Sequence, residues 1–173
     1  LTTTMINKKI LITGTAGFVG FHLAQSLASQ GHSITGLDNI NDYYSVELKY
    51  DRLAELGIER KAAEQWHKPV QSAKYPNLRH IRMNLEDRER LPELFTQEKY
   101  DIVIHLAAQP GVRYSLENPE VYIDSNIVGF LNILECCRHN DIEHLIYASS
   151  SSVYGENSKI PFAEADRVDE PVS

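Results

Sequence analysis

Residues 8–20 read KKILITGTAGFVG, an apolar stretch that runs into a glycine-rich turn and then into the start of a helix. In such a turn, Gly14 allows the chain to leave the strand sharply, and Gly17 allows the backbone to approach a pyrophosphate. Gly20 allows the helix to pack closely on the strand. The free N–H groups at the start of the helix hold phosphate without a lysine. The stretch predicts a phosphate site, although a strand–helix turn of another α/β protein has a similar pattern.

The residues after this turn favour a dinucleotide over a simple phosphate. Apolar residues recur at helical spacing from Val19 to Leu27, and residues 33–37 are predicted to form a second strand that ends in Asp38. An aspartate about twenty residues after the last glycine can accept both hydroxyls of an adenosine ribose. Residues 39–42 (NIND) offer no cation for a 2′-phosphate. The sequence therefore predicts NAD as the cofactor rather than NADP.

The length and charge of the chain limit the alternatives. At 173 residues it has the size of one domain. We expect a single NAD-binding domain over residues 1–173, with residues 58–75 as an insertion because they show no clear period. A formal net charge of −7 and a pI near 5.5 argue against a nucleic-acid partner and against an anionic membrane surface.

The cysteines and histidines give no sign of a metal site or a disulfide. Cys136 and Cys137 are adjacent within an apolar helical pattern, which is typical of buried thiols in a reducing cytoplasm. No CxxC or HExxH motif occurs, so we expect no metal. No apolar run approaches the roughly twenty residues of a membrane span. We expect a cytoplasmic protein without a membrane partner.

The remaining strands and helices alternate along the chain. Strands are predicted at residues 78–85, 102–107 and 145–149, and helices at residues 45–56, after Asp87, and at residues 118–139. This alternation favours a Rossmann-like, doubly wound parallel sheet of α/β class with strand order 3-2-1-4-5. Ligands bind such sheets at the carboxyl ends of the strands, where the glycine turn, Asp38 and the serines after residue 149 would meet.

Five motifs in order resemble one known family. They are GTAGFVG (14–20), DNINDYY (38–44), LAAQPGVRYSLENP (106–119), DSNIVGFLNILECC (124–137) and YASSSSVYG (147–155). Together they resemble extended short-chain dehydrogenase/reductases of the NAD-dependent epimerase/dehydratase family, and within them UDP-glucuronate 4-epimerases of bacterial surface-polysaccharide biosynthesis. The similarity covers residues 8–173, apart from residues 58–75.

The resemblance assigns roles to individual residues. Ser150 matches the catalytic Ser/Thr of the family. Asn84 departs from the aspartate that is common at its position. The implied cofactor contacts are Phe18 and Val19 at the pyrophosphate, Asp38 and Asn39 at the adenosine ribose, Asn84 and Leu85 at the adenine, Leu106, Ala107, Ala108 and Gln109 beneath the fourth strand, and Ser125 or Asn126 from the long helix.

The serine run bears on the type of reaction. Related 4,6-dehydratases carry an Asp-Glu pair before Val-Tyr-Gly, and related decarboxylases carry a Glu there, whereas this chain has Ser151 and Ser152. Hydroxyl groups cannot replace carboxylates in acid–base work, but they can donate hydrogen bonds to a sugar carboxylate. A serine-rich polar loop is the alternative interpretation. Arg113 is either a ligand for a substrate anion or the partner of a structural salt bridge.

The family's catalytic Tyr-x-x-x-Lys pair does not occur in the sequence. We therefore expect the chain to be the N-terminal cofactor part of an epimerase, without turnover alone and with most of its UDP-sugar site absent. The resemblance implies a homodimer at full length through residues 118–139. UDP-glucose 4-epimerase, a nucleotide-sugar dehydratase and a non-catalytic NAD-binding module remain alternatives.

Overall fold

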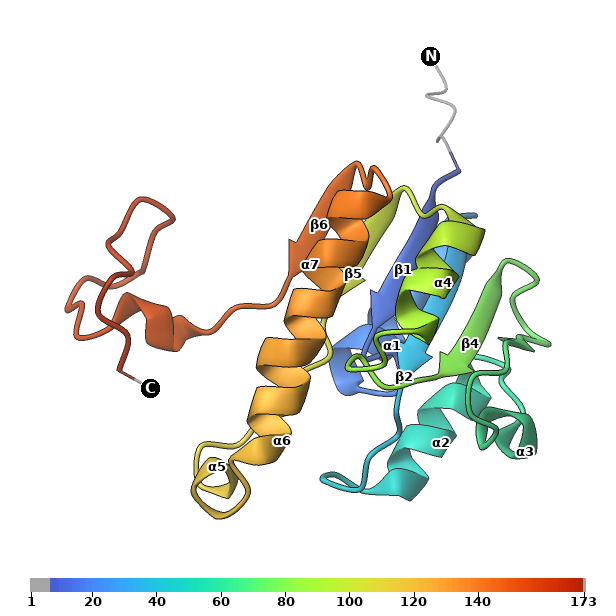
Figure 1. The fold of residues 1–173 in the computed structure, drawn as a ribbon, viewed down its shortest axis with the longest axis horizontal. Coiled ribbons are helices and arrows are strands. Elements are labelled where there is room, and N and C mark those ends of the chain that lie inside the picture. The colour runs from blue at the N-terminus through green and yellow to red at the C-terminus, as the bar shows by residue number, and fades with distance from the viewer. Residues whose placement is uncertain (1–6, 173) are drawn as a thin grey trace.

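One mixed sheet forms the centre of the molecule, with strands in the spatial order β3-β4-β2-β1-β5-β6 (Figure 1). The computed structural model describes residues 7–172. Within them the strands are β1 (Lys9–Thr13), β2 (Ser33–Asp38), β3 (Val70–Gln71), β4 (Leu78–Arg82), β5 (Ile102–His105) and β6 (His144–Tyr147). Without the two-residue β3, the order is the expected 3-2-1-4-5, and all neighbouring pairs among these strands are parallel. The predicted doubly wound α/β fold is confirmed.

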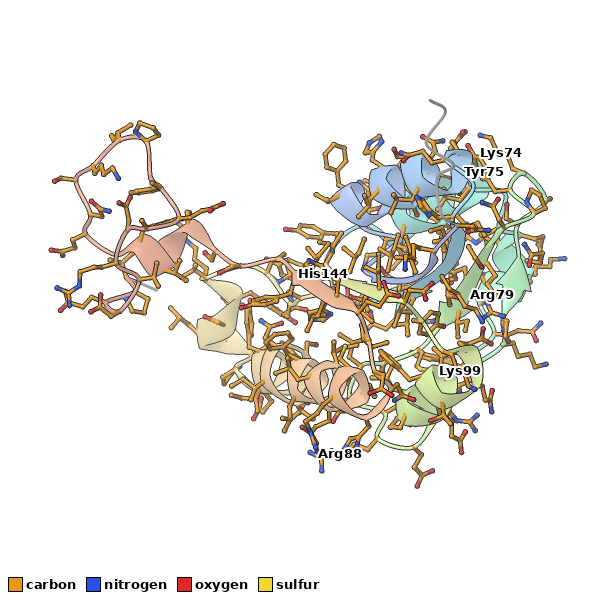
Figure 2. All side chains as sticks on the ribbon, turned by 90° about the horizontal axis from the view of Figure 1, so that it is seen from above. Lys74, Tyr75, Arg79, Arg88, Lys99 and His144 are labelled. Carbon is orange, nitrogen blue, oxygen red and sulfur yellow. The ribbon has the colours of Figure 1, made fainter. Side chains whose placement is uncertain are left out.

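Helices cover both faces of the sheet. They are α1 (Phe18–Ser29), α2 (Val46–Glu55), α3 (Arg60–Ala63), α4 (Arg90–Glu98), α5 (Tyr114–Glu117), α6 (Glu120–Tyr122) and α7 (Gly129–His139). Seen from above, α1 and α2 lie on one side of the sheet, whereas α4 and α7 lie on the other (Figure 2). Within the described residues, no helix combines the length and apolarity needed to cross a membrane.

The alternation of side chains along each strand explains why a separate hydrophobic core lies on each face of the sheet. Ile10 and Ile12 belong to the cluster under α1 and α2, whereas Leu11 between them belongs to the cluster under α4 and α7. Successive side chains of a strand point to opposite faces. A strand that is covered on both faces therefore reads as a continuous apolar run. The apolar runs at residues 10–12 of β1 and 102–104 of β5 follow from this double burial.

Capping residues set several helix boundaries. Ser45 Oγ accepts a hydrogen bond from the Leu48 N–H and begins α2. Asp87, expected as a cap, accepts from the Glu89 and Arg90 N–H groups, although α4 begins at Arg90. Gly57 has a φ of +78° after α2, in the left-handed region that ends many helices.

Three strands end earlier than the sequence predicted. The apolar patterns suggested ends at residues 85, 107 and 149, whereas β4, β5 and β6 end at Arg82, His105 and Tyr147. The register gives the reason, because Arg82 pairs with the last residue of β2, and His105 pairs with the last residue of β1. In each case only the N–H of the next residue still donates to the neighbouring strand, from Met83 to the Asp38 carbonyl, from Leu106 to the Thr13 carbonyl and from Ala148 to the His105 carbonyl. The residues that follow enter the loops at the carboxyl edge.

The long helix predicted at residues 118–139 is interrupted. Between α6 and α7, residues Ile123–Val128 form a π-helical segment. Asn118, expected as the N-cap of this long helix, instead follows the last residue of α5, and Pro119 takes the N-cap position of α6. π-turns occur frequently at functional sites.

Residues 58–75 extend the sheet beyond β4. They contribute α3 and β3, which pairs antiparallel with β4. Trp66 forms an isolated bridge with Arg82, whose guanidinium lies 4.3 Å from the centre of the indole ring. At the opposite edge, the chain after β6 leaves the sheet as a separate arm that contains the 3₁₀ turn Ser151–Tyr154 (Figure 1).

Candidate functional site

The glycine turn joins β1 to α1 at the carboxyl edge of the sheet. Gly14 has a φ of +79°, and its N–H donates to the Leu37 carbonyl at 2.7 Å. A Cβ atom on Gly20 would overlap the Gly14 carbonyl oxygen, so the helix packs directly on the turn. The first turn of α1 carries no acidic residue, and Phe18 and Val19 are 65% and 61% exposed. The helix N-terminus is therefore open to an anion.

Asp38 ends β2 as a buried carboxylate. Its Oδ1 accepts from the Ile40 N–H at 2.8 Å, and its Oδ2 accepts from the Ala16 N–H at 3.1 Å. Burial raises the pKa of the Asp38 carboxyl, against the effect of these N–H groups and of the nearby Lys49 charge. Each carboxylate oxygen can accept two hydrogen bonds, so acceptor capacity remains for ligand hydroxyls.

Thr13 connects β1 to the end of β5. Its hydroxyl oxygen accepts from the Leu106 and Ala107 N–H groups at 3.2 and 3.1 Å, and it lies 2.8 Å from His105 Nδ1. With both lone pairs of the oxygen used, the hydroxyl hydrogen points to Nδ1. Burial lowers the pKa of His105 to about 4, so its ring is neutral. This group fixes the backbone of residues 105–107.

The loop after β5 is held by the π-helical segment. The Gln109 N–H donates to Asn126 Oδ1 at 2.8 Å, and Asn126 Nδ2 donates to the Gln109 carbonyl at 3.0 Å. Gln109 is itself only 6% exposed. The side-chain amide of Asn126 thus pairs with both the N–H and the carbonyl of Gln109, and it holds this loop beside the carboxyl ends of the strands.

These elements surround one cavity of about 310 Å³ at the carboxyl ends of the strands. The cavity lies where the chain reverses direction across the sheet between β1 and β5, which is the position at which doubly wound sheets bind ligands. Thirteen of the fifteen expected cofactor residues line it. They are Gly14, Gly17, Phe18, Val19, Gly20, Asp38, Asn39, Leu85, Leu106, Ala107, Ala108, Gln109 and Ser125.

Asn84 and Asn126 are outside the cavity lining. Asn126 acts on the cavity indirectly, through the two hydrogen bonds to Gln109. The structure also adds lining residues that the sequence did not single out, namely Leu37, Asn41, Tyr43, Tyr44, Lys49, Met83, Glu86 and Pro110.

Lys49 is the most informative of the added residues. It is a cation at the cavity, whereas the sequence offered none directly after Asp38. Its position four and seven residues before Leu53 and Leu56 places it on the buried face of α2. The feature of the sequence that could have identified Lys49 is a lysine on an otherwise apolar helix face.

A comparison with protein families matches residues 10–173 to the family described as "NAD dependent epimerase/dehydratase family". The chain belongs to this family. The match begins within β1 and extends over all the elements that follow it.

Curated relatives cover nearly the whole chain. It is 53% identical over 165 residues to Protein CapI of Staphylococcus aureus, and this match covers 95% of the chain but 44% of the relative. It is 45% identical to a probable UDP-glucuronate 4-epimerase of Rhizobium meliloti, with the same coverage. The chain therefore spans less than half the length of these two relatives.

Solved structures show the same partial coverage. A UDP-N-acetylglucosamine 4-epimerase from Methanobrevibacter ruminantium, in complex with UDP-N-acetylmuramic acid, is 28% identical with a TM-score of 0.72, and the match covers 98% of this chain and 46% of that one. The Thermus thermophilus UDP-glucose 4-epimerase in complex with NAD is 29% identical with a TM-score of 0.70, at 95% and 45% coverage.

In this epimerase/dehydratase-family chain, the expected catalytic and substrate residues lie apart from the cavity lining. Ser150 begins the C-terminal arm, and its Oγ accepts from the Ser152 N–H at 3.2 Å. Ser151 and Arg113 are exposed, and Ser152 is half-buried. None of these four residues lines the cavity. Arg113 makes no salt bridge within residues 7–172, so its structural alternative gains no support there.

The described part of the chain contains no candidate metal site. Among residues 7–172, no three His, Cys, Asp or Glu side chains are grouped so that they could hold an ion. Burial raises the pKa of the Cys136 thiol to about 12 and that of Cys137 to about 11, so both thiols are protonated at neutral pH.

Proposed function

We propose that the cavity binds NAD and that the chain is the cofactor part of a nucleotide-sugar 4-epimerase. The observation that carries the proposal is the meeting of the glycine turn and the Asp38 carboxylate around one cavity between β2 and β5. The two groups suit the two ends of an ADP moiety, because helix N–H groups bind pyrophosphate and a carboxylate accepts ribose hydroxyls.

Each part of the cavity then has a role. Phe18 and Val19 contact the pyrophosphate, Asp38 and Asn39 hold the adenosine ribose, and Leu85 packs against the adenine. The loop from Leu106 to Gln109 and Ser125 hold the nicotinamide half. Asn126 supports these contacts from outside the lining, through its hydrogen bonds to the Gln109 backbone.

The reaction proposed for the whole protein is inversion at C4 of a UDP-sugar. NAD, when bound, would supply the hydride acceptor and donor that inversion at C4 requires. The chain's own residues would hold and orient the dinucleotide and keep water from it. Ser150 would donate a hydrogen bond to the sugar 4-oxygen after the C-terminal arm moves to the cavity.

UDP-glucuronate is the substrate that we propose. A relative from Rhizobium meliloti, 45% identical, is named a probable UDP-glucuronate 4-epimerase, and one from Arabidopsis thaliana, 44% identical, is named UDP-glucuronate 4-epimerase 2. Ser151 and Ser152 also support this choice, because they offer hydroxyl donors to a sugar carboxylate where a glutamate would repel it. The same two residues argue against a dehydratase, which needs acid–base carboxylates.

UDP-glucose 4-epimerase is the second candidate. Solved neighbours at 26–29% identity carry that activity in their descriptions. The two candidates differ at the sugar C6, which is a carboxylate in one substrate and a hydroxymethyl group in the other. The two candidates can be separated by the preference of the whole protein for the charged substrate. If Ser151→Ala and Ser152→Ala reduce this preference, UDP-glucuronate is favoured.

The test has two stages. Calorimetric titration of NAD⁺ into the 173-residue chain examines the cavity, and a folded chain without binding would refute the cofactor proposal. Incubation of the whole protein with UDP-glucuronate and with UDP-glucose, followed by separation of the C4 epimers, examines the reaction. Conversion of UDP-glucose alone would leave the second candidate in place of the first, and conversion of neither would refute the epimerase proposal.

The oligomeric state is a further part of the proposal. Ile123, Ile127 and Leu131 project from the π-helical segment and α7 and are 49%, 58% and 51% exposed. Their spacing of four residues places them on one face of the helix. This apolar face supports a homodimer of the whole protein, which light scattering would test.

A further inference from the structure

Lys49 is a buried cation within the cavity lining. It is only 7% exposed, although it lies on a helix at the edge of the sheet. Lysine is almost never fully buried unless its ammonium group is paired. The partners of its Nζ atom therefore indicate why the residue is there.

Both partners belong to a single residue of the loop after β2. Lys49 Nζ donates to the Asn41 carbonyl at 2.8 Å and to Asn41 Oδ1 at 2.6 Å. An ammonium has three N–H donors. In the part of the chain that the structure describes, no acceptor is recorded for the third. Burial lowers the pKa of the Lys49 ammonium, and the Asp38 charge acts against this effect.

The loop of residues 39–44, to which Lys49 is bonded at Asn41, continues to the other side of the cavity. Asn41 Nδ2 lies 3.4 Å from Gln109 Oε1, and Gln109 is fixed by Asn126. Two residues further along the loop, Tyr43 packs against Gly111 so closely that a Cβ atom there would overlap the phenol oxygen. Lys49 is thus the inner anchor of a connection between the loops that flank the cavity.

We propose that Lys49 is a positioning residue for the dinucleotide, which holds residues 39–44 over the adenosine half and directs its remaining N–H toward the ribose beside Asp38. This inference rests on the proposed function of the cavity. The ligand chemistry is that of a ribose diol next to a carboxylate, where a fixed cation balances the Asp38 charge and an additional donor orients one hydroxyl.

A purely structural role is the alternative. In that case Lys49 would join α2 to the loop without any effect on the ligand, and its loss would lower stability alone. The two roles differ in the rate at which a bound dinucleotide leaves. A loss of stability reduces the fraction of folded chain, whereas a loose loop increases the release rate of the chain that remains folded.

The experiment compares Lys49→Met with Lys61→Met, which removes an exposed lysine of α3 that makes no recorded side-chain hydrogen bond. Calorimetry with NAD⁺ gives the affinity, and stopped-flow fluorescence with NADH gives the release rate. Hydrogen exchange of residues 39–44 gives the order of the loop. We expect Lys49→Met to bind NAD⁺ about ten- to a hundredfold more weakly, as for a lost hydrogen bond to a charged group, mainly through faster release.

The control should match the unmodified chain in all three measurements. Lys49→Gln, which keeps an amide donor, provides the same test if the methionine variant does not fold. Unchanged affinity and release in both Lys49 variants, in a chain that binds NAD⁺, would overturn this inference alone. Weaker affinity with unchanged exchange of residues 39–44 would overturn the positioning of the loop by Lys49 and would support only its direct hydrogen bond to the ribose. A folded, unmodified chain that binds no NAD⁺ would overturn the proposed function as well.

Discussion

The hydroxyl oxygen of Thr13 lies 2.8 Å from Nδ1 of His105, and this contact joins the last residues of the two central strands. Both side chains are buried, and the same oxygen accepts from the Ala107 N–H at 3.1 Å. The first residues of the loop that lines the cavity are thereby fixed to the strand that precedes the glycine turn. A change at Thr13 should therefore affect stability and ligand binding together.

Thr13→Val tests this connection. Valine has nearly the same shape, but it leaves the Ala107 N–H and His105 Nδ1 without their partner. Leaving a buried polar group unsatisfied costs about 1–3 kcal/mol, so we expect a loss of that size in urea unfolding together with weaker NAD⁺ binding. Thr13→Ser keeps the hydroxyl and should lose less. A serine variant as unstable as the valine variant would show that packing, not hydrogen bonding, makes Thr13 important.

Two buried histidines should make the fold sensitive to mild acid. Burial lowers the pKa of His105 to about 4 and that of His80 to about 3. In the unfolded chain both titrate near pH 6.5. Below that pH the unfolded state binds protons that the folded state excludes, so stability is complete above about pH 6.5 and falls as the pH drops toward 4. Each histidine contributes at most about 1.4 kcal/mol per pH unit.

Urea unfolding at several pH values between 5 and 7.5 measures this slope. His80→Gln should reduce it by up to one proton, because the titrating group is removed. His144→Gln, which replaces an exposed histidine of β6 (Figure 2), is the surface control for that variant. Equal slopes in the unmodified chain and in His80→Gln would contradict the expectation.

The sheet and most of the cavity could be predicted from the sequence because local rules determine them. Apolar strands alternate with helices, which selects a doubly wound parallel sheet, and the carboxyl ends of such strands meet at one edge. Gly14 directly follows β1, Asp38 is the last residue of β2, and Gln109 lies in the loop that follows β5. Their positions along the chain therefore place them around the same cavity once the strand order is known.

The features that could not be predicted depend on contacts between distant residues. Lys49 reaches the cavity because α2 packs its face against the sheet, and the sequence alone does not show which loop its ammonium meets. Residues Ile123–Val128 have no distinctive composition, so the sequence alone does not predict their π-turn. Ser150 follows β6, but the arm that carries it leaves the sheet rather than covering the cavity (Figure 1).

Gly20→Ala tests the contact between α1 and the turn. The added methyl group would overlap the Gly14 carbonyl, which is backbone and cannot move without the turn. Overpacking of this kind typically costs about 1–3 kcal/mol, and we expect NAD⁺ binding to fall with it. Gly31→Ala is the matched control, because nothing lies within 4 Å of a Cβ there although its φ is +91°.

The control should lose about 1–2 kcal/mol from its backbone conformation, with unchanged NAD⁺ affinity in the folded fraction. Thermal unfolding and calorimetry on both variants separate the two effects. Equal NAD⁺ affinity in Gly20→Ala and Gly31→Ala would mean that close packing of the helix on the turn is not needed for binding.

Asp38→Asn examines the choice between the two nicotinamide dinucleotides. The amide keeps one oxygen for the Ile40 N–H, but it loses the charge that favours ribose hydroxyls and repels a 2′-phosphate. We expect NAD⁺ to bind about ten- to a hundredfold more weakly, as for the loss of a charged hydrogen bond. The affinity for NADP⁺ should fall less, because the nearby Lys49 cation remains and is no longer opposed by Asp38.

Calorimetry with both ligands measures the ratio of the two affinities, and Asp51→Asn on the exposed side of α2 is the control. An unchanged ratio in Asp38→Asn would mean that the preference for NAD is set elsewhere in the cavity, with the loop of Asn41 and Tyr43 as the next region to vary.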